Sequence, residues 1–422
     1  MAHPIILFGA FDRHNLGDLL FPHVVAALLP GRQLVFAGLA ERDLRAFGGH
    51  KVSALSEVGP RLAGAAAVLI HAGGEVLTTD AWQAAVMLQP PERVASLIAY
   101  LETHPLERRD WVIHTLGTDA PAPYAMGRSI CPQASHVIYN AAGGVDLDQA
   151  TPEHRAAVLA ELKAADALTV RDRRTQALLA AGGVPAGVIP DPAVMTAELF
   201  GARIRRLFTT DEPARIAQRF PQGHVAVQLS ADFGDDATLG RIAGQLNRIA
   251  DWTGYGIVLF RAGGAPWHDD AGCLERLAAQ INPAKVTLYP SLDIWKICAL
   301  IAQSRACCTS SLHGRIVALS FAVPHINVRL PASPAGASSG PASKQAAFVE
   351  TWESEETREP AETSTSDAVA GVPACVAITD IAEHLHTVLE TSPQRLQRIA
   401  MRLADEYRRG FAALCAPFTG TP

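Results

Sequence analysis

Short apolar runs alternate with longer stretches of helical period along most of the chain. Residues 5–9, 67–71 and 306–309 are strand-length and almost wholly apolar, which is typical of strands that are buried on both faces. Stretches such as 19–29 and 237–252 repeat apolar positions every three to four residues, so they predict helices. Strands that alternate with helices in this way predict an α/β fold with parallel sheets.

The alternation occurs twice along the chain. It runs through residues 1–195 and restarts at 221–391, so we expect two Rossmann-like domains that face a central cleft. Residues 196–220 read as a linker with an embedded helix. Residues 331–375 are rich in Ser, Ala, Pro and Gly and predict a flexible insertion in the second domain. Residues 393–415 predict a C-terminal helix that could pack back on the first domain.

Two local predictions are more specific. The run WVIHTL at residues 111–116 is predicted to be a strand that follows a helix at 91–102. Within the flexible insertion, residues 344–352 are predicted to be an ordered island.

Composition narrows the class of partner. The chain has 422 residues with 36 basic and 42 acidic side chains, a net charge of -6, which argues against a nucleic-acid partner. Its apolar stretches are shorter than the ~20 residues that span a bilayer. The seven cysteines are scattered and have no metal-site spacing. We therefore expect a cytoplasmic protein with no integral membrane segment and no metal, and leave contact with a membrane surface open.

Two loops of the first domain follow apolar strands and carry residues suited to ligand contact. Ligands of open α/β sheets bind at the carboxyl ends of the strands, where glycines allow the backbone to approach a ligand. Neither loop has the spacing of a dinucleotide or P-loop motif. The candidate substrate-binding residues of these loops are Asn15, Gly17, Asp18, Gly73, Gly74 and Glu75.

Two further segments carry candidate chemistry. Arg171 follows a strand at 167–170, and a guanidinium there suits phosphate or carboxylate. The segment Ser310-Ser311-Leu312-His313-Gly314-Arg315 combines hydroxyls, helix-start amides, a histidine and an arginine after another strand. That combination suits an anion at the positive end of a helix, and a histidine can transfer a proton near neutral pH. We therefore take Ser310, Ser311 and Arg315 as binding residues and His313 as catalytic.

Five segments together resemble one known family. They are FGAFDRHNLGD, VLIHAGGEVL, YNAAGG, LTVRDRRTQALLAAGG with VIPDPAVM behind it, and YPSLDIWKICALIAQSRACCTSSLHGRIVALSFAVPHINV. In their order and approximate spacing, from residue 5 to about residue 330, the chain is similar to the polysaccharide pyruvyl transferases. Members of that family transfer a group from phosphoenolpyruvate to sugar hydroxyls as a ketal.

The resemblance implies a fold similar to the two-domain GT-B glycosyltransferases and assigns roles by position. His313 falls on a histidine regarded as important for catalysis, and Arg171 on an arginine thought to meet the donor's anionic groups, so both are taken as catalytic. Many members have arginine where this chain has Ser311, and a lysine often found after the last strand is missing. Arg315, Arg329 or Lys344 is expected to replace the missing cation.

The expected function is therefore transfer of a pyruvyl group from phosphoenolpyruvate to a saccharide, with no cofactor beyond that donor. The acceptor is left open between a lipid-linked oligosaccharide, a polymer and a small metabolite. Two other readings stay open. One is a GT-B glycosyltransferase with a nucleotide-sugar donor and Glu75 as base. The other is a non-catalytic module that binds carbohydrate or phosphate.

Overall fold

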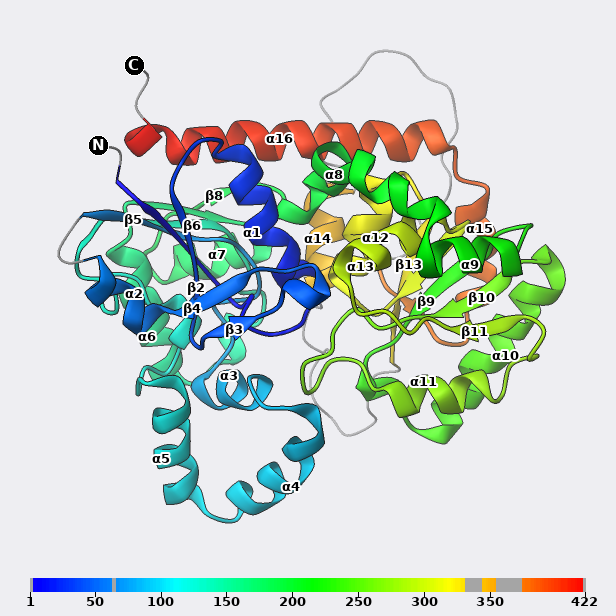
Figure 1. Ribbon diagram of the computed structural model, residues 1–422, viewed down its shortest axis with the longest axis horizontal. Helices are drawn as coiled ribbons and strands as arrows, with labels where there is room; N and C mark the ends of the chain where they lie inside the picture. The colour runs from blue at the N-terminus through cyan, green and yellow to red at the C-terminus, as the bar shows by residue number, and fades with distance from the viewer. Residues whose placement is uncertain (1–2, 63–65, 331–343, 354–373, 420–422) are drawn as a thin grey trace. The chain divides into compact units, whose positions relative to one another are not determined.

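The computed structural model describes residues 3–62, 66–330, 344–353 and 374–419. Its contacts divide the chain into two compact units, whose elements are labelled in Figure 1. Unit 1 comprises residues 1–192, 264–266 and 405–422, and unit 2 comprises residues 193–263 and 267–404.

Unit 1 is built on an eight-stranded sheet with the order β3-β4-β2-β1-β5-β6-β7-β8. All neighbouring strands are parallel except β3 and β4, which are antiparallel. The strands are β1 (Ile5–Phe8), β2 (Leu34–Gly38), β3 (Arg42–Asp43), β4 (Lys51–Ala54), β5 (Ala67–His71), β6 (Ala134–Ala142), β7 (Ala167–Val170) and β8 (Gly187–Val188).

Helices cover both faces of this sheet, as the apolar strands require. Ile6 and Phe8 of β1 belong to a hydrophobic cluster on one face, and their neighbours Ile5 and Leu7 are fully buried on the other. The first face packs against α2, α3, α5, α6 and α7. The helices of this unit are α1 (Leu16–Leu28), α2 (Leu55–Arg61), α3 (Ala81–Met87), α4 (Pro91–Glu102), α5 (Pro105–Leu116), α6 (Pro152–Lys163) and α7 (Arg173–Ala181).

The strand predicted at residues 111–116 is wrong, because these residues form the end of helix α5. Val112 and Leu116, four residues apart, are its buried positions, and Trp111 packs edge-on against Trp82 of α3. Pro105 stands in the first turn, and Gly117 ends the helix in the left-handed conformation. Packing with a period of four residues therefore outweighed the strand preference of Trp, Val and Ile.

Unit 2 contains a six-stranded sheet with the order β11-β10-β9-β12-β13-β14, in which all neighbouring pairs are parallel. Its strands are β9 (His224–Gln228), β10 (Gly256–Leu259), β11 (Val286–Leu288), β12 (Ala306–Thr309), β13 (His325–Arg329) and β14 (Val376–Ala377). Its helices are α8 (Thr196–Arg206), α9 (Asp211–Arg219), α10 (Asp236–Thr253), α11 (Ala271–Ala278), α12 (Ile294–Gln303), α13 (Leu312–Ser320), α14 (Lys344–Trp352) and α15 (Ile381–Leu389).

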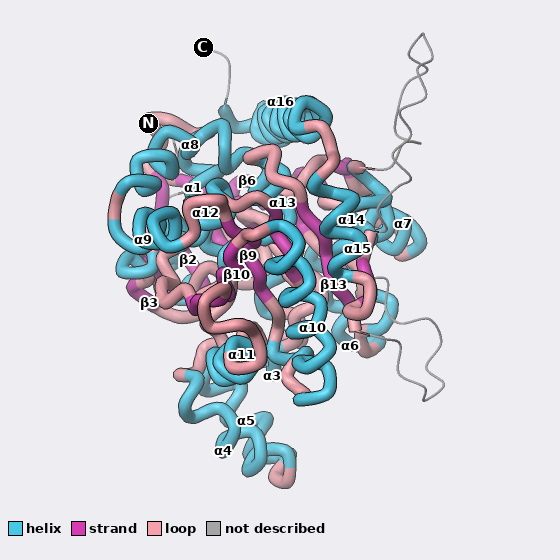
Figure 2. The backbone as a smooth tube through the Cα atoms, turned by 90° about the vertical axis from the view of Figure 1, so that its right-hand side faces the viewer, coloured by secondary structure: helices cyan, strands magenta, loops and turns pink. Residues whose placement is uncertain are grey.

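The helices of unit 2 also form two layers. One face of the sheet shares a hydrophobic cluster with α10, α11 and α15, and Figure 2 shows α10 and α15 beside the strands β10 and β13. On the other side, α12, α13 and α8 pack against one another, and α13 contacts β12 and β13. The predicted α/β fold with mostly parallel sheets is thus confirmed.

The remaining predicted segments lie as follows. Residues 196–220 are helical and belong to unit 2, and the island 344–352 is helix α14. Residues 331–343 and 354–373 of the predicted insertion lie outside the described residues. Helix α16 (Pro393–Thr419) belongs to unit 1 from residue 405 onward.

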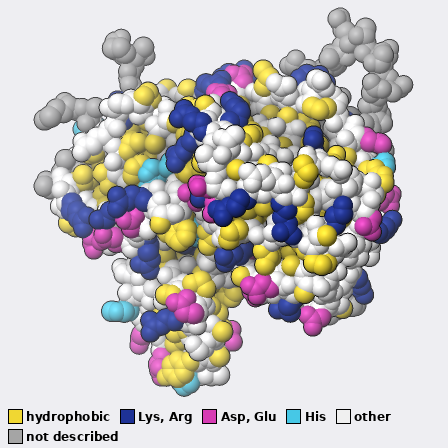
Figure 3. Space-filling model, turned by 45° about the vertical axis from the view of Figure 1, so that its right-hand side comes forward, with side chains coloured by type: hydrophobic (Ala, Val, Ile, Leu, Met, Phe, Trp, Pro, Cys, Tyr) yellow, Lys and Arg dark blue, Asp and Glu magenta, His cyan; other side chains and the backbone are white. Residues whose placement is uncertain are grey.

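Two properties bear on the expected partners. Over the described ranges, no helix combines the length and the apolar character that crossing a membrane requires. On the face drawn in Figure 3, Lys and Arg side chains of the described residues lie in scattered groups among acidic and hydrophobic ones.

Candidate functional site

The candidate loops lie where the strand order of each sheet reverses, because the chain adds strands first on one side of the central strand and then on the other. In unit 1, β2 and β5 lie on opposite sides of β1, so the loops after β1 and β5 begin next to each other. In unit 2, β10 and β12 flank β9 in the same way. Ligands of open α/β sheets bind at such reversal points, and the candidate segments of the sequence follow β1, β5 and β12.

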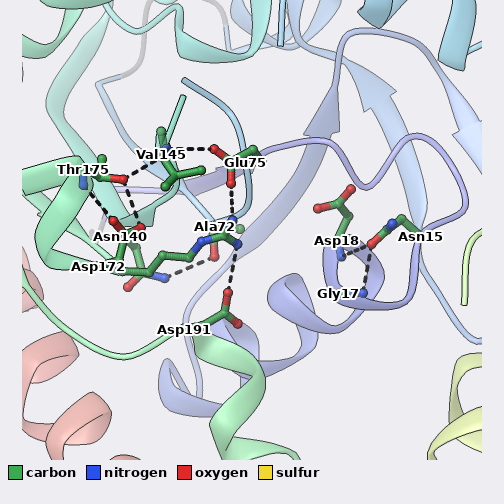
Figure 4. A network of polar contacts seen from close by, with 12 residues as sticks. Asn15, Gly17, Asp18, Ala72, Glu75, Asn140, Val145, Asp172, Thr175 and Asp191 are labelled. Atoms are coloured by element: carbon green, nitrogen blue, oxygen red, sulfur yellow. Dashed lines mark hydrogen bonds and ion pairs between the residues drawn. The ribbon is translucent and has the colours of Figure 1, made fainter. Parts of the chain in front are cut away.

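The loop after β1 leads into helix α1. Asn15 is the N-cap of this helix, and its Oδ1 accepts hydrogen bonds from the amides of Gly17 at 3.1 Å and Asp18 at 3.4 Å (Figure 4). Gly17 and Asp18 are buried in the first turn. The Asn15 side chain is therefore engaged in capping the helix, as the residue type favours.

The loop after β5 depends on its two glycines. Gly73 and Gly74 have φ values of +123° and +100°, a region that residues with a side chain rarely adopt. A Cβ at Gly74 would lie 3.0 Å from Oδ1 of Asp18, so the glycine also allows the two loops to approach each other. Glu75 follows directly, with a side chain that is 24% exposed.

Arg171 lies between two carboxylates at the end of β7. Its Nη2 donates to Glu75 and its Nη1 to Oδ2 of Asp191 at 3.1 Å, and Figure 4 shows Glu75 and Asp191 in contact with the same guanidinium. Only 2% of the Arg171 side chain is exposed. Burial lowers the pKa of Arg171, but the charges of Glu75 and Asp191 outweigh burial and raise it, so the group stays protonated.

This cluster has two consequences. A Cβ at Gly143 would lie 2.7 Å from Nη2 of Arg171, so that glycine makes room for the guanidinium. The charge of Arg171 is balanced inside the protein, and its hydrogen bond holds the half-buried carboxylate of Glu75 in place. The geometry therefore ties Arg171 to Glu75, and the catalytic role of Arg171 stays a prediction.

In unit 2, the segment at 310–315 joins strand β12 to helix α13. Ser311 is the N-cap, and its Oγ accepts from the amide of Gly314 at 3.3 Å. The hydroxyl of Ser310 accepts from the amide of Ser230 at 2.8 Å. The Ser310 hydroxyl also donates to Oε1 of Gln228 at 3.5 Å. A hydroxyl that accepts a bond keeps its own proton for donation, so Ser311 retains the ability to bind an anion.

Gln228, the last residue of β9, organises this segment. Its Oε1 accepts from Oγ1 of Thr309 at 2.6 Å and from the amide of Ser311 at 3.0 Å. Its Nε2 donates to Oδ1 of Asp269 at 2.7 Å, and burial raises the pKa of that carboxyl to about 7. Gln228 is not among the residues predicted from the sequence, although a glutamine that ends an apolar strand is a signal for such a position.

His313 is the second residue of α13 and is 7% exposed. Gly314 follows it, and a Cβ there would lie 2.7 Å from Oγ1 of Thr309. The helix can therefore start this close to β12 only because residue 314 is glycine. The sequence pair His-Gly thus couples a candidate proton donor to a close contact between helix and strand.

Arg315 is engaged in a buried ion pair. Its Nε donates to Oε1 of Glu353 at 2.8 Å and its Nη2 to Oε2 at 2.7 Å, while Nη1 donates to Oδ1 of Asn327 at 3.2 Å. Burial raises the pKa of Glu353, but the charge of Arg315 outweighs burial and holds it well below its usual range. Glu353 is not among the predicted site residues, because it directly follows the ordered island in a stretch predicted to be flexible.

The two other candidate cations lie at the ends of elements. Lys344 is exposed at the start of α14, next to Gln345, whose Nε2 donates to the carbonyl of Ser310 at 2.5 Å. Arg329 is exposed at the end of β13. Lys344 is therefore adjacent in sequence to a residue that contacts the segment 310–315. Arg315, in contrast, is held by Glu353 and Asn327.

The predicted site residues thus form two groups, each within one unit. The group in unit 1 consists of Asn15, Gly17, Asp18, Gly73, Gly74, Glu75 and Arg171. The group in unit 2 consists of Ser310, Ser311, His313, Arg315 and Lys344. In the described part of the chain, His, Cys, Asp and Glu form no cluster of three or more suited to a metal ion.

Comparison with known proteins bears on the family. Residues 131–330 match the family model described as polysaccharide pyruvyl transferase. The resemblance to the polysaccharide pyruvyl transferases is confirmed. The segment matched to these pyruvyl transferases contains Arg171, His313 and the whole of 310–315. No curated protein matches the chain.

Solved structures resemble the fold. A putative UDP-N-acetylglucosamine 2-epimerase from Listeria monocytogenes aligns with 100% of this chain and 98% of its own, with a TM-score of 0.54 and 12% identity. The S. aureus MnaA–UDP co-structure has a TM-score of 0.52 and 14% identity, and the alignment covers 100% of this chain and 99% of that chain. The UDP-GlcNAc 2-epimerase from Neisseria meningitidis bound to UDP-GlcNAc has a TM-score of 0.51 and 12% identity, and the alignment covers 98% of this chain and 100% of that chain. At these identities the likeness concerns the fold alone, and it confirms the GT-B-like prediction.

Proposed function

We propose that the protein transfers a pyruvyl group from phosphoenolpyruvate to two hydroxyls of a saccharide acceptor, which forms a ketal and releases phosphate. The observation that carries this proposal is the family match over residues 131–330, which includes the His313 segment. The position of that segment at the reversal point of the unit 2 sheet supports it, because a substrate of an α/β protein binds at such a point.

His313 is the proposed proton donor. The methylene carbon of phosphoenolpyruvate takes up a proton, and C2 becomes electrophilic. One acceptor hydroxyl adds to C2 and loses its proton. The bond between C2 and the phosphate oxygen then breaks, the second hydroxyl bonds to C2 in its place, and the proton of that hydroxyl leaves with the released phosphate. A histidine can hold and give up a proton near neutral pH, and the buried position of His313 at a helix start limits competition from water.

The donor's anionic groups are proposed to bind near the start of α13. Ser311 presents a hydroxyl proton, Ser310 would turn its hydroxyl from Gln228 to the donor, and Lys344 brings a cation next to the contact between Gln345 and Ser310. Arg315 is assigned a supporting role, because Glu353 balances its charge. Lys344 therefore replaces Arg315 as the preferred substitute for the cation that many family members carry at position 311.

Donor binding tests the proposal directly. Calorimetric titration with phosphoenolpyruvate is expected to give saturable binding, and a matched panel of UDP- and GDP-sugars is expected to give none. Phosphate release that depends on both phosphoenolpyruvate and a saccharide is the expected activity. Binding of a nucleotide sugar without binding of phosphoenolpyruvate would contradict the proposal and support the glycosyltransferase reading.

Lys344 provides a sharper test of the donor site. Lys344→Met is expected to weaken phosphoenolpyruvate binding, because it removes a cation and leaves the Gln345 contact in place. Lys285→Met, a change of the same kind in unit 2, is the matched control. Equal affinities of both variants and the wild type would remove Lys344 from the site.

A further inference from the structure

Arg13 is a buried cation that the proposed chemistry does not use. It follows β1 in unit 1 and is 8% exposed. Among the described residues, its Nε and Nη1 have no hydrogen-bond partner, so three of the five N–H groups of this guanidinium lack an acceptor. Buried polar groups are nearly always paired, so this exception marks N–H groups for which the described residues supply no acceptor.

The groups around Arg13 stabilise its charge but leave some of its N–H groups without an acceptor among the described residues. Nη2 lies 3.9 Å from Oδ2 of Asp18, beyond hydrogen-bond distance, and the guanidinium lies over the ring of Tyr124 at 4.9 Å from its centroid. The adjacent carboxylate of Asp12 accepts from the Leu39 amide at 2.6 Å and from the Tyr124 hydroxyl at 2.7 Å. Asp12 is thus committed to other donors.

Arg13 lines a cavity of about 280 Å³ in unit 1, close to the lower limit of about 300 Å³ for small-molecule sites. Arg42 lines the same cavity, and its side chain donates to the carbonyls of Glu41 at 2.9 Å and Leu88 at 3.0 Å. These acceptors are neutral, so Arg42 keeps its net charge. The cavity therefore carries a second cation besides Arg13.

His14 also lines this cavity. Its Nδ1 accepts from the amide of Gly264 at 2.9 Å, and both residues line the cavity. A ring nitrogen that accepts is unprotonated, so in the neutral ring Nε2 carries the proton. The amide of Gly264 thus fixes the orientation of the His14 ring at the cavity.

We propose that this cavity binds an oxyanion, a phosphate or carboxylate carried by a sugar, with Arg13 and Arg42 as its cationic partners. The inference rests on the proposed function, because it assigns the cavity to the acceptor. The proposed acceptor is therefore a saccharide that carries a negative charge. Guanidinium groups suit this task, since they bind phosphate and carboxylate oxygens with directed N–H groups.

Binding of model anions tests the site without turnover. The probes are glucose 1-phosphate and glucuronate, with glucose as the neutral control, each titrated at low salt in the absence of phosphoenolpyruvate. Wild-type protein is expected to bind at least one anion and not glucose, and the tighter anion identifies phosphate or carboxylate as the source. If neither anion binds, the inference is overturned.

Substitutions locate the binding. Arg13→Met is expected to raise the Kd at least tenfold, and Arg42→Met is expected to raise it less, because Arg42 is exposed. Arg61→Met removes an exposed arginine of the same unit, and its Kd is expected to equal that of the wild type. An unchanged Kd in Arg13→Met would place the anion elsewhere, including the donor site, and overturn the assignment.

Two further measurements keep the result interpretable. If Arg13→Met does not fold, Arg13→Lys decides, since it keeps the charge, loses the planar N–H array and is expected to weaken binding several-fold. Phosphoenolpyruvate titration of the same variants separates the two proposals. Loss of anion binding with normal phosphoenolpyruvate binding supports a separate acceptor site. If the wild type binds the anion but no phosphoenolpyruvate, the assignment of the cavity stands and only the proposed donor is overturned.

Discussion

The guanidinium of Arg315 and the carboxylate of Glu353 form two parallel hydrogen bonds, at 2.8 Å and 2.7 Å, in the interior of unit 2. Glu353 lies 38 residues further along the chain, directly after helix α14. The pair therefore ties α14, and with it Lys344, to the helix that carries His313. A cation that the sequence assigned to the substrate is balanced by the protein itself.

Glu353→Gln is expected to destabilise unit 2 by about 3–5 kcal/mol, because it leaves Arg315 buried without its counter-charge. Chemical unfolding at neutral pH measures the change. The control is Asp236→Asn, which breaks an exposed ion pair with Arg276 and is expected to change stability by less than about 1 kcal/mol. Similar losses for the two variants would show that the buried pair contributes little.

His313→Gln is expected to lower kcat by about 10²- to 10⁴-fold while phosphoenolpyruvate still binds, because glutamine keeps much of the volume but cannot transfer a proton. Stopped assays of phosphate release and donor titration give the two quantities. His136→Gln, a substitution in strand β6, is the control and is expected to leave kcat unchanged. Near-normal turnover by His313→Gln would remove His313 from the proposed mechanism.

Gly314→Ala is expected to destabilise unit 2 by about 1–3 kcal/mol, because the new Cβ would lie 2.7 Å from Oγ1 of Thr309. Gly244→Ala, in α10, is a matched control, since a Cβ there meets no atom within 4 Å. Alanine is the better helix former, so this control is expected to gain about 0.5–1 kcal/mol. Thermal unfolding of both variants gives the two signs, and a gain in both would contradict the close contact.

Stability is expected to fall as the pH drops below 6.5, in part because of His71. Burial lowers the pKa of His71 to about 3, whereas the unfolded chain takes up this proton near pH 6.5. A pKa that is lower in the folded state gives stability that is fully present above 6.5 and is lost toward pH 3, by about 1.4 kcal/mol per pH unit.

His71→Phe should remove this contribution, because phenylalanine does not titrate and can stack on Tyr139 as the histidine ring does at 3.9 Å. Denaturant unfolding at pH 7, 6 and 5 measures the slope of stability with pH. An exposed histidine, His104, replaced by Gln, is the control and is expected to keep the wild-type slope. Equal slopes in all three proteins would argue against a role for His71.

The carboxyl ends of the strands were the part of the candidate site that could be predicted from the sequence. Apolar runs that end in Gly-Gly or in Ser-Ser-Leu-His identify β5 and β12, since a buried parallel strand must be apolar and its carboxyl end can bear polar residues. Helix α5 shows the limit of this reasoning. Its last six residues include Trp, Val, Ile and Thr, which favour strands, and tertiary packing, including the contact of Trp111 with Trp82 of α3, makes them helical.

The sequence by itself determined the α/β class, the family resemblance and the positions of Arg171 and His313, because these depend on period and on local motifs. The tertiary structure alone decided which charges meet. Glu75 and Asp191 balance Arg171, Glu353 balances Arg315, and Arg13 retains N–H groups without an acceptor among the described residues. Such pairings join residues far apart in the chain, and whether a cation can serve a substrate depends on the carboxylates that folding brings beside it.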